Sequence, residues 1–145
     1  TPGSSGGGCN GGDSSFESAV LSMVNYQRAQ AGAAPLSASS ALTSAARNHS
    51  QDMATNNFFS HTGSNGSSFS DRISSAGFSY SYAAENIYAG NGGNNSASAA
   101  VSAWMGSEGH RTNMLNPIYT HAGAGYWCNS SSSYGGYFTL DLAKP

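Results

Sequence analysis

The chain has 145 residues and carries few charges: 8% of its residues are Asp, Glu, Lys or Arg, and the formal net charge is −2. This length suits one domain with its own core. The weak charge excludes the basic surface that proteins use to bind nucleic acid or anionic lipid. No apolar run approaches the roughly 20 residues that a membrane-spanning helix needs. We therefore expect no nucleic-acid partner and no transmembrane segment.

The first twelve residues, TPGSSGGGCNGG, are mainly Gly and Ser. This composition predicts a flexible segment that is tethered only by Cys9, and it leaves residues 13–145 as the single domain. The chain begins at Thr1 without an apolar leader sequence, so we expect a signal peptide to have been removed already.

Four segments carry apolar residues at helical spacing. In the first, Asp13 or Ser14 can cap the helix, and Gly32 followed by Pro35 ends it. Asn94 or Asn95 marks the start of the last predicted helix. In chain order, the predicted helices cover about 14–31, 39–56, 68–76 and 96–107.

Three segments, 85–88, 119–128 and 135–142, are typical of strands. The connection between the last two is short enough for an antiparallel hairpin. Gly123 and Gly125 share one strand face, which indicates the close approach of another element. In the final strand, alternation predicts that Phe138, Leu140 and Leu142 face inward and that Tyr137, Thr139 and Asp141 face outward. Helices that precede most strands favour an α+β class or layered α/β/α packing.

The two cysteines, Cys9 and Cys128, lie near opposite ends of the chain. In an extracellular protein the simplest expectation is a disulfide, which contributes up to ~4–5 kcal/mol in the chain-entropy model. The alternative is two unrelated buried thiols.

N-x-S/T triplets, which mark glycosylation acceptors in secreted proteins, begin at Asn48, Asn65, Asn94 and Asn129.

Four histidines are the main candidates for chemistry. His49 lies on the apolar stripe of the second helix and is expected in the core, and His121 is expected at the surface. His61 opens a glycine-rich loop, where functional residues are common. His110 follows the fourth helix in Ser-Glu-Gly-His, and it could either serve a site or only interact with the last helix carbonyls.

Glu85 stands in an uncharged, aromatic stretch, Tyr-Ala-Ala-Glu-Asn-Ile-Tyr. If buried, it needs a partner, because an unpaired carboxylate costs several kcal/mol or shifts its pKa. The candidates are Arg28, Arg72, Arg111, or a protonated or metal-bound histidine. These residues alone give equal weight to a structural Glu–Arg pair and to a functional site.

The order of short motifs resembles a known family. The motifs are Asn-Tyr-Gln-Arg at 25–28, Phe-Ser-His-Thr at 59–62, Glu-Asn-Ile at 85–87, Gly-His-Arg at 109–111 and Gly-Ala-Gly-Tyr at 123–126. This set is similar to the CAP superfamily (cysteine-rich secretory protein, antigen 5, pathogenesis-related), in its short microbial SCP-like extracellular form. The resemblance covers about residues 16–142. It implies an α+β, three-layer α-β-α sandwich with a C-terminal antiparallel hairpin, and an extracellular location.

The resemblance also implies a metal site. Family members carry a cleft with two histidines and two acids, and several bind zinc or another divalent ion there. Here His61 and His110 match the histidines and Glu85 matches the first acid, which makes these three the expected ligands of Zn²⁺ or another divalent cation. The position of the second acid holds Ser107, and Glu108 stands one residue later.

Two functions are compatible with that resemblance. We expect a secreted, monomeric binding module, because CAP-like domains are similar to carriers of sterols or fatty acids and act in host–microbe contact. Its partner would be a small apolar ligand or a cell-wall or host component. The alternative is a metal-dependent hydrolase of cell-wall polysaccharide or protein, in which His61, Glu85 and His110 would be catalytic and Glu108 would be the general base. Aromatic residues that could line an apolar groove, or pack the core instead, are Phe58, Phe59, Phe69, Phe78, Tyr80 and Tyr82.

Overall fold

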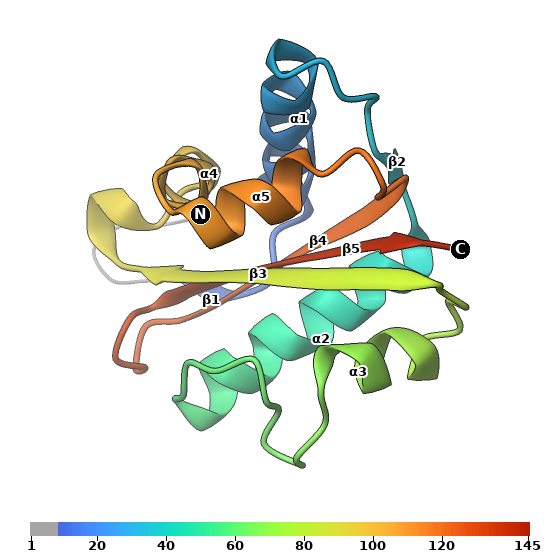
Figure 1. Cartoon of the computed structure of the whole chain (residues 1–145). Coiled ribbons are helices and arrows are strands. Elements are labelled where there is room, and N and C mark those ends of the chain that lie inside the picture. The colour runs from blue at the N-terminus through green and yellow to red at the C-terminus, as the bar shows by residue number, and fades with distance from the viewer. Residues whose placement is uncertain (1–8) are drawn as a thin grey trace.

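Two helical layers enclose one sheet in this computed structural model, which describes residues 9–145 (Figure 1). One face of the sheet is covered by α1 (Ser14–Gln30), α4 (Ala97–Met105) and α5 (Glu108–Leu115). The other is covered by α2 (Ser40–Asn56) and α3 (Phe69–Ser75). This arrangement is the α+β, three-layer α-β-α sandwich that the motifs implied.

The sheet has the strand order β1-β4-β5-β3, with β2 paired to β4 off this path. β3 (Tyr82–Gly90) is antiparallel to β5 (Gly136–Lys144), and β5 is antiparallel to β4 (His121–Asn129). The short β1 (Asn10–Gly11) and β2 (Ser37–Ala38) add to β4. The predicted C-terminal hairpin is confirmed, and β3 lies at one end of the sheet.

Side-chain caps explain where the helices begin. Asp13, Ser39, Ser68 and Ser96 each accept a hydrogen bond from a backbone N–H in the first turn of the helix that follows. Such caps satisfy donors that have no partner inside the helix. The predicted fourth helix ends at Met105, and a separate helix, α5, begins at Glu108. His110 therefore lies in the first turn of a helix that the sequence pattern did not predict, and not beside the last carbonyls of α4.

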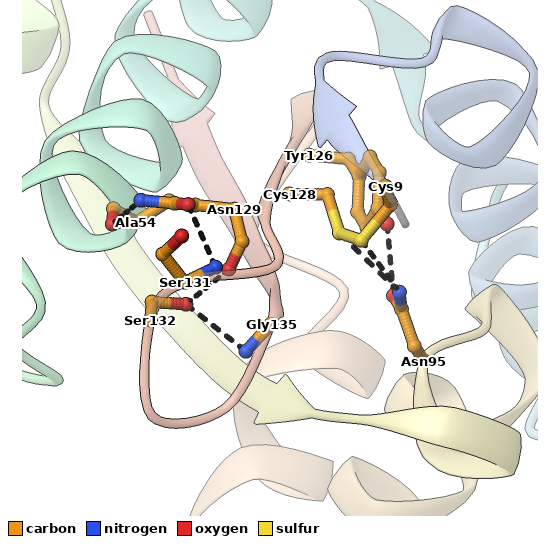
Figure 2. The surroundings of a disulfide bond; sticks show 9 residues. All are labelled: Cys9, Ala54, Asn95, Tyr126, Cys128, Asn129, Ser131, Ser132 and Gly135. Carbon is orange, nitrogen blue, oxygen red and sulfur yellow. Dashed lines mark hydrogen bonds between the residues drawn. A yellow bond between two sulfur atoms is a disulfide. The ribbon is translucent and has the colours of Figure 1, made fainter. Parts of the chain in front are cut away.

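The N-terminal segment is joined to β4 by a disulfide and by strand pairing. Cys9 and Cys128 are bonded, with their Cα atoms 5.6 Å apart (Figure 2). Next to this bond, Asn10 and Gly11 pair with Asn129 and Cys128. The disulfide prediction is confirmed. The expected flexibility of residues 1–12 does not hold for Asn10 and Gly11, and residues 1–8 lie outside the described part of the chain.

Both faces of β5 are buried, which corrects one expectation. Tyr137, Thr139 and Asp141, predicted to face outward, are fully buried against the α2 layer. The alternation in the sequence identified two faces but not that helices cover both of them. Gly123 and Gly125 explain how α2 comes so close, since a Cβ at either position would collide with the backbone at Thr43 or Arg47.

No helix within residues 9–145 combines the length and apolar character needed to cross a membrane.

Candidate functional site at the β3 edge

Glu85 is a buried carboxylate in the middle of β3, and its side chain is 0% exposed. Its two oxygens lie 3.0 and 2.9 Å from Nη2 of Arg72 on α3. The same carboxylate accepts a hydrogen bond from Nδ1 of His61 at 2.9 Å. Arg28 and Arg111, the other arginines considered, bind backbone carbonyls instead. The carboxylate is thus paired with a cation and fixed in direction, as its burial requires.

Burial alone would raise the pKa of Glu85, but hydrogen bonds from His61 and Asp141 and the charge of Arg72 outweigh it and lower that pKa. Glu85 is therefore ionised at neutral pH. As an ionised carboxylate it can only accept, so the shared proton sits on Nδ1 of His61, and the lone pair of the neutral form of that ring lies on Nε2.

The loop that carries His61 is held at several points. Arg72 donates from Nη2 to the carbonyl of His61 and from Nη1 to the carbonyl of Ser67. Asp52 on α2 accepts from the backbone N–H of Ser64. The His61 ring is 51% exposed. The loop thus fixes one side of the ring against Glu85 and leaves the other side open to solvent.

His49 supports the same loop from inside the core. It is 1% exposed, and its Nε2 donates to the carbonyl of Ser60 at 2.7 Å. Its Nδ1 is buried and has no partner within residues 9–145. Burial lowers the pKa of His49, which keeps the ring neutral. The prediction of a core histidine is confirmed, and its hydrogen bond to the residue before His61 is a link that sequence reasoning missed.

Asp141 completes the buried polar group on this face. It pairs directly across from Glu85 on β5 and is 0% exposed. Burial, and then the neighbouring charge of Glu85, raise the pKa of Asp141 well above its ordinary value. Neither oxygen accepts a hydrogen bond within the described residues. A protonated Asp141 resolves this, because its O–H can donate to the Glu85 carboxylate.

His110 is brought to the same edge of the sheet from the opposite layer. Its Nδ1 lies 3.0 Å from the hydroxyl of Ser107, and its carbonyl accepts from the amide of Asn86 at 3.1 Å. The Asn86 amide oxygen accepts in turn from Asn113 of α5. Adjacent residues on a strand point to opposite faces of the sheet. Glu85 therefore holds His61 on the face covered by α2 and α3, while Asn86 holds α5 on the opposite face. The role of Asn86 was not predicted.

The two histidine rings are electrostatically coupled. Burial lowers the pKa of His110, and the positive charge of a protonated His61 lowers it further. Both rings have their Nδ1 atoms engaged, and neither Nε2 has a hydrogen-bond partner among the described residues. The arrangement offers two imidazole nitrogens at one edge of the sheet.

Glu108, the second acidic residue considered, is the exposed first residue of α5. No hydrogen bond joins it to His61, Glu85 or His110. Its negative charge suits the N-terminus of a helix, and this contribution does not require contact with the histidines.

Few side-chain donors at this edge of the sheet are free to bind a metal ion. Residues 9–145 contain no group of three or more His, Cys, Asp or Glu side chains arranged to hold an ion. The oxygens of Glu85 are occupied by Arg72 and His61. What remains is a pair of imidazoles, a donor type that suits zinc, with the other coordination positions left for water or a ligand.

A separate apolar groove lies between α1 and α4, with a volume of about 450 Å³. It is lined by Ser22, Met23, Tyr26, Gln27, Ser98, Val101, Ser102 and Met105. None of the six aromatic residues considered as groove lining is among them. Instead, Phe69, Phe78 and Tyr80 pack against α2 and α3 residues, and Phe58 packs beside Met53.

Residues 21–142 match the family described as CAP, the cysteine-rich secretory protein family. The protein belongs to the CAP family. This CAP domain is 42% identical over 113 residues to YkwD of Bacillus subtilis (strain 168). The matched region is 78% of this chain and 43% of YkwD. It is 38% identical over 112 residues to the membrane protein YlbC of the same organism, covering 75% of this chain and 31% of YlbC. The chain thus spans less than half the length of these curated relatives.

Among solved structures, the CAP domain is similar to an extracellular protein of Bacillus anthracis that contains an SCP domain. The TM-score is 0.81 at 27% identity, over 92% of this chain and 41% of that protein. An outer surface protein of Borrelia burgdorferi shares the fold, with a TM-score of 0.75 at 18% identity, over 86% of this chain and 89% of the other. These neighbours are described as extracellular or outer-surface proteins.

Proposed function

We propose that this CAP domain is a secreted binding module whose cleft holds one divalent cation, Zn²⁺ in the first instance, through Nε2 of His61 and Nε2 of His110. The observation that supports this proposal is the hydrogen bond between His61 and the buried Glu85. A carboxylate that accepts from one ring nitrogen orients the ring and makes the other nitrogen a better ligand. Glu85 therefore acts on the metal through His61 and not as a ligand.

The remaining coordination positions determine what the module can do. A bound divalent cation would polarise an oxygen atom of water or of a ligand. The chain's own residues set the geometry: Arg72 neutralises Glu85, Asn86 fixes the backbone of His110, and Ser107 contacts its ring. A hydrolase remains the alternative, and it would need Glu108 or another base to reach the bound water.

Zinc titration by calorimetry at pH 7.5 tests the proposal. We expect one site in the wild type, at least tenfold weaker binding in His61→Ala and in His110→Ala, and weaker binding in Glu85→Gln. His121→Ala is the matched control, because His121 lies at the start of β4 and contacts Phe78 and Thr120 instead of the cleft. Wild-type affinity in the His110 variant would overturn the proposal. Chelator-sensitive hydrolysis of peptidoglycan or casein would favour the enzyme.

The groove between α1 and α4 favours a second ligand, a small apolar molecule. Met23, Val101 and Met105 supply apolar walls, and the volume of about 450 Å³ is in the range of small-molecule sites. A fluorescent fatty acid should bind the wild type and lose affinity in Val101→Asn, which places a polar amide in the wall. Unchanged affinity in that variant would remove the groove from consideration.

Secretion and glycosylation are part of the proposal. The disulfide between Cys9 and Cys128 favours an oxidising compartment. Asn48, Asn65 and Asn94 are exposed, whereas the amide of Asn129 donates to the carbonyl of Ala54. Mass spectrometry of the protein from culture medium would detect it there and would find any glycans on the first three asparagines, not on Asn129.

A further inference from the structure

Two aromatic side chains lie against each other on the surface, away from the apolar groove. Phe59, in the loop after α2, is 45% exposed, and Tyr134, in the connection between β4 and β5, is 46% exposed. Their ring centroids are 6.0 Å apart, with planes tilted by 56°. Large apolar side chains that remain exposed and touch each other at the surface indicate a contact site when their setting is otherwise polar.

The backbone holds these two rings in place before any partner arrives. Asn57 caps α2 in the left-handed conformation, with φ of 53°, and is the one non-glycine residue with positive φ among residues 9–145. This turn packs Phe58 into the core beside Met53 and sends Phe59 outward. The Asn57 side chain accepts from the backbone N–H of Ser133 at 2.9 Å, which ties the Phe59 loop to the segment that carries Tyr134.

The segment around Tyr134 is fixed from two further sides. Asn129 donates to the carbonyl of Ala54 on α2, and Ser132 accepts from the backbone N–H of Gly135 (Figure 2). Tyr137, which is fully buried, lies edge-on to Tyr134 with the centroids 6.2 Å apart. A partner would therefore bind rings that are already ordered, which lowers the entropic cost of binding.

The chain segments that carry the two rings are polar and uncharged. Residues 56–60 and 129–136 contain Asn, Ser and Gly besides the aromatic residues, and no Asp, Glu, Lys or Arg. Hydroxyl and amide groups next to aromatic faces suit a ligand that presents both apolar C–H faces and many hydroxyls. A lipid or an apolar protein surface would leave these polar groups without partners, and an ionic ligand would find no counter-charge here.

We propose that Phe59 and Tyr134 form an aromatic platform that binds an uncharged, β-1,4-linked polysaccharide. The pyranose rings of such a chain expose flat C–H faces that stack on aromatic rings, and their hydroxyls and amides meet the exposed serine side chains of the two segments. Phe59 precedes His61 by two residues, so the platform and the cleft share one loop. The platform does not depend on a metal ion and goes beyond the cation site proposed above.

The test is titration of the intact protein with chitohexaose, an uncharged β-1,4-linked hexamer, in buffer that contains chelator. Calorimetry should show binding by the wild type, at least tenfold weaker binding by Phe59→Ala and by Tyr134→Ala, and retained binding by Tyr134→Phe. Since both side chains are about half exposed, the alanine variants should keep the wild-type melting temperature, which separates lost binding from lost folding.

Tyr82→Ala and Tyr26→Ala are the matched controls, because these tyrosines are 52% and 62% exposed on β3 and α1. Both should bind chitohexaose as the wild type does. No binding by the wild type, or an equal loss in the Tyr82 variant, would overturn the proposal. So would tighter, salt-sensitive binding of an acidic glycan such as hyaluronate. The chelator makes failure here independent of any failure at the histidines.

Discussion

The two faces of the central sheet are buried by different means. Toward α1, α4 and α5, the strands present Phe138, Leu140 and Leu142, which pack with Val20 and Trp104. Toward α2 and α3, apolar clusters around Leu42 and Met53 flank a buried polar network. In this network the strands present Thr139, Asp141 and Glu85, and α2 contributes His49 and Ser50. Alternate residues of one strand, β5, thus serve an apolar core on one side and a polar network on the other.

The difference separates what stabilises the fold from what shapes the site. The apolar face gains free energy from area removed from water. On the α2 and α3 side, each buried polar group needs its own hydrogen-bond partners, and a group left without them costs free energy. In return, that face holds His61 in one orientation. We therefore expect substitutions of apolar core residues such as Phe138 to change stability alone, and substitutions in the polar network around Glu85 to change stability and metal binding together.

The largest stability loss is expected for Phe138→Ala. The side chain is 1% exposed and packs against Phe16 and Tyr126, and removal of a buried phenylalanine ring leaves a cavity that costs about 3–5 kcal/mol. Denaturant unfolding measures the loss. At temperatures where the variant is folded, its zinc affinity should equal that of the wild type. Reduced zinc affinity in the folded variant would show that the faces are not independent.

Glu85→Ala comes next, with an expected loss of about 2–4 kcal/mol, because it leaves the largely buried Arg72 without its carboxylate. The same change releases the His61 ring, so zinc affinity should fall as well. Denaturant melts and calorimetry on one preparation measure both effects. Glu85→Gln keeps the shape and should lose less stability than the alanine variant. An alanine variant with wild-type stability would mean that the network contributes nothing to folding.

An effect that is small near pH 4 and grows with pH is expected for Asp141→Asn. The raised pKa keeps Asp141 protonated in the folded state, whereas in the unfolded chain it ionises near pH 3.9. Above that pH, unfolding releases a proton, so this residue lowers stability as pH rises toward its folded-state pKa, by about 1.4 kcal/mol per pH unit. The asparagine variant can still donate to Glu85 but does not titrate.

The stability of Asp141→Asn relative to the wild type should therefore increase from pH 4 to pH 7, as measured by urea melts at several pH values. The lowered pKa of Glu85 contributes in the opposite sense, through stability that is lost as pH falls, and the asparagine amide can replace the hydrogen bond that Asp141 donates to Glu85. A difference between the two proteins that stays constant with pH would show that Asp141 is ionised in the fold.

The sequence was sufficient for most of the fold and for part of the site. Periodicity located α1 to α4, although Ser96 and not Asn94 or Asn95 caps α4. The glycines at 123 and 125 indicated the approach of another element, which is α2. The helix α5 was not predicted, since Glu-Gly-His-Arg-Thr-Asn lacks an apolar stripe. The outward assignment of Asp141 failed because alternation along a strand does not reveal what covers its second face.

The partners within the site depend on contacts distant in sequence. Arg72 was one of four kinds of partner considered for Glu85, and only the packing of α3 against β3 selects it. Asn86 and His49 support the two histidine-bearing segments through backbone carbonyls, and an interaction with a carbonyl leaves no pattern in the partner's side-chain sequence. The aromatic platform likewise requires the end of α2 and the β4–β5 connection to be adjacent.

The central claim, that buried Glu85 fixes His61 so that Nε2 can bind a metal, is tested most directly by ¹⁵N NMR of the imidazole rings. In metal-free protein at pH 7.5, the spectra should show His61 as the tautomer protonated at Nδ1. Added Zn²⁺ should shift Nε2 of His61 and of His110, with His121 unchanged. A His61 ring protonated at Nε2, or ring nitrogens that do not respond to zinc, would contradict the account.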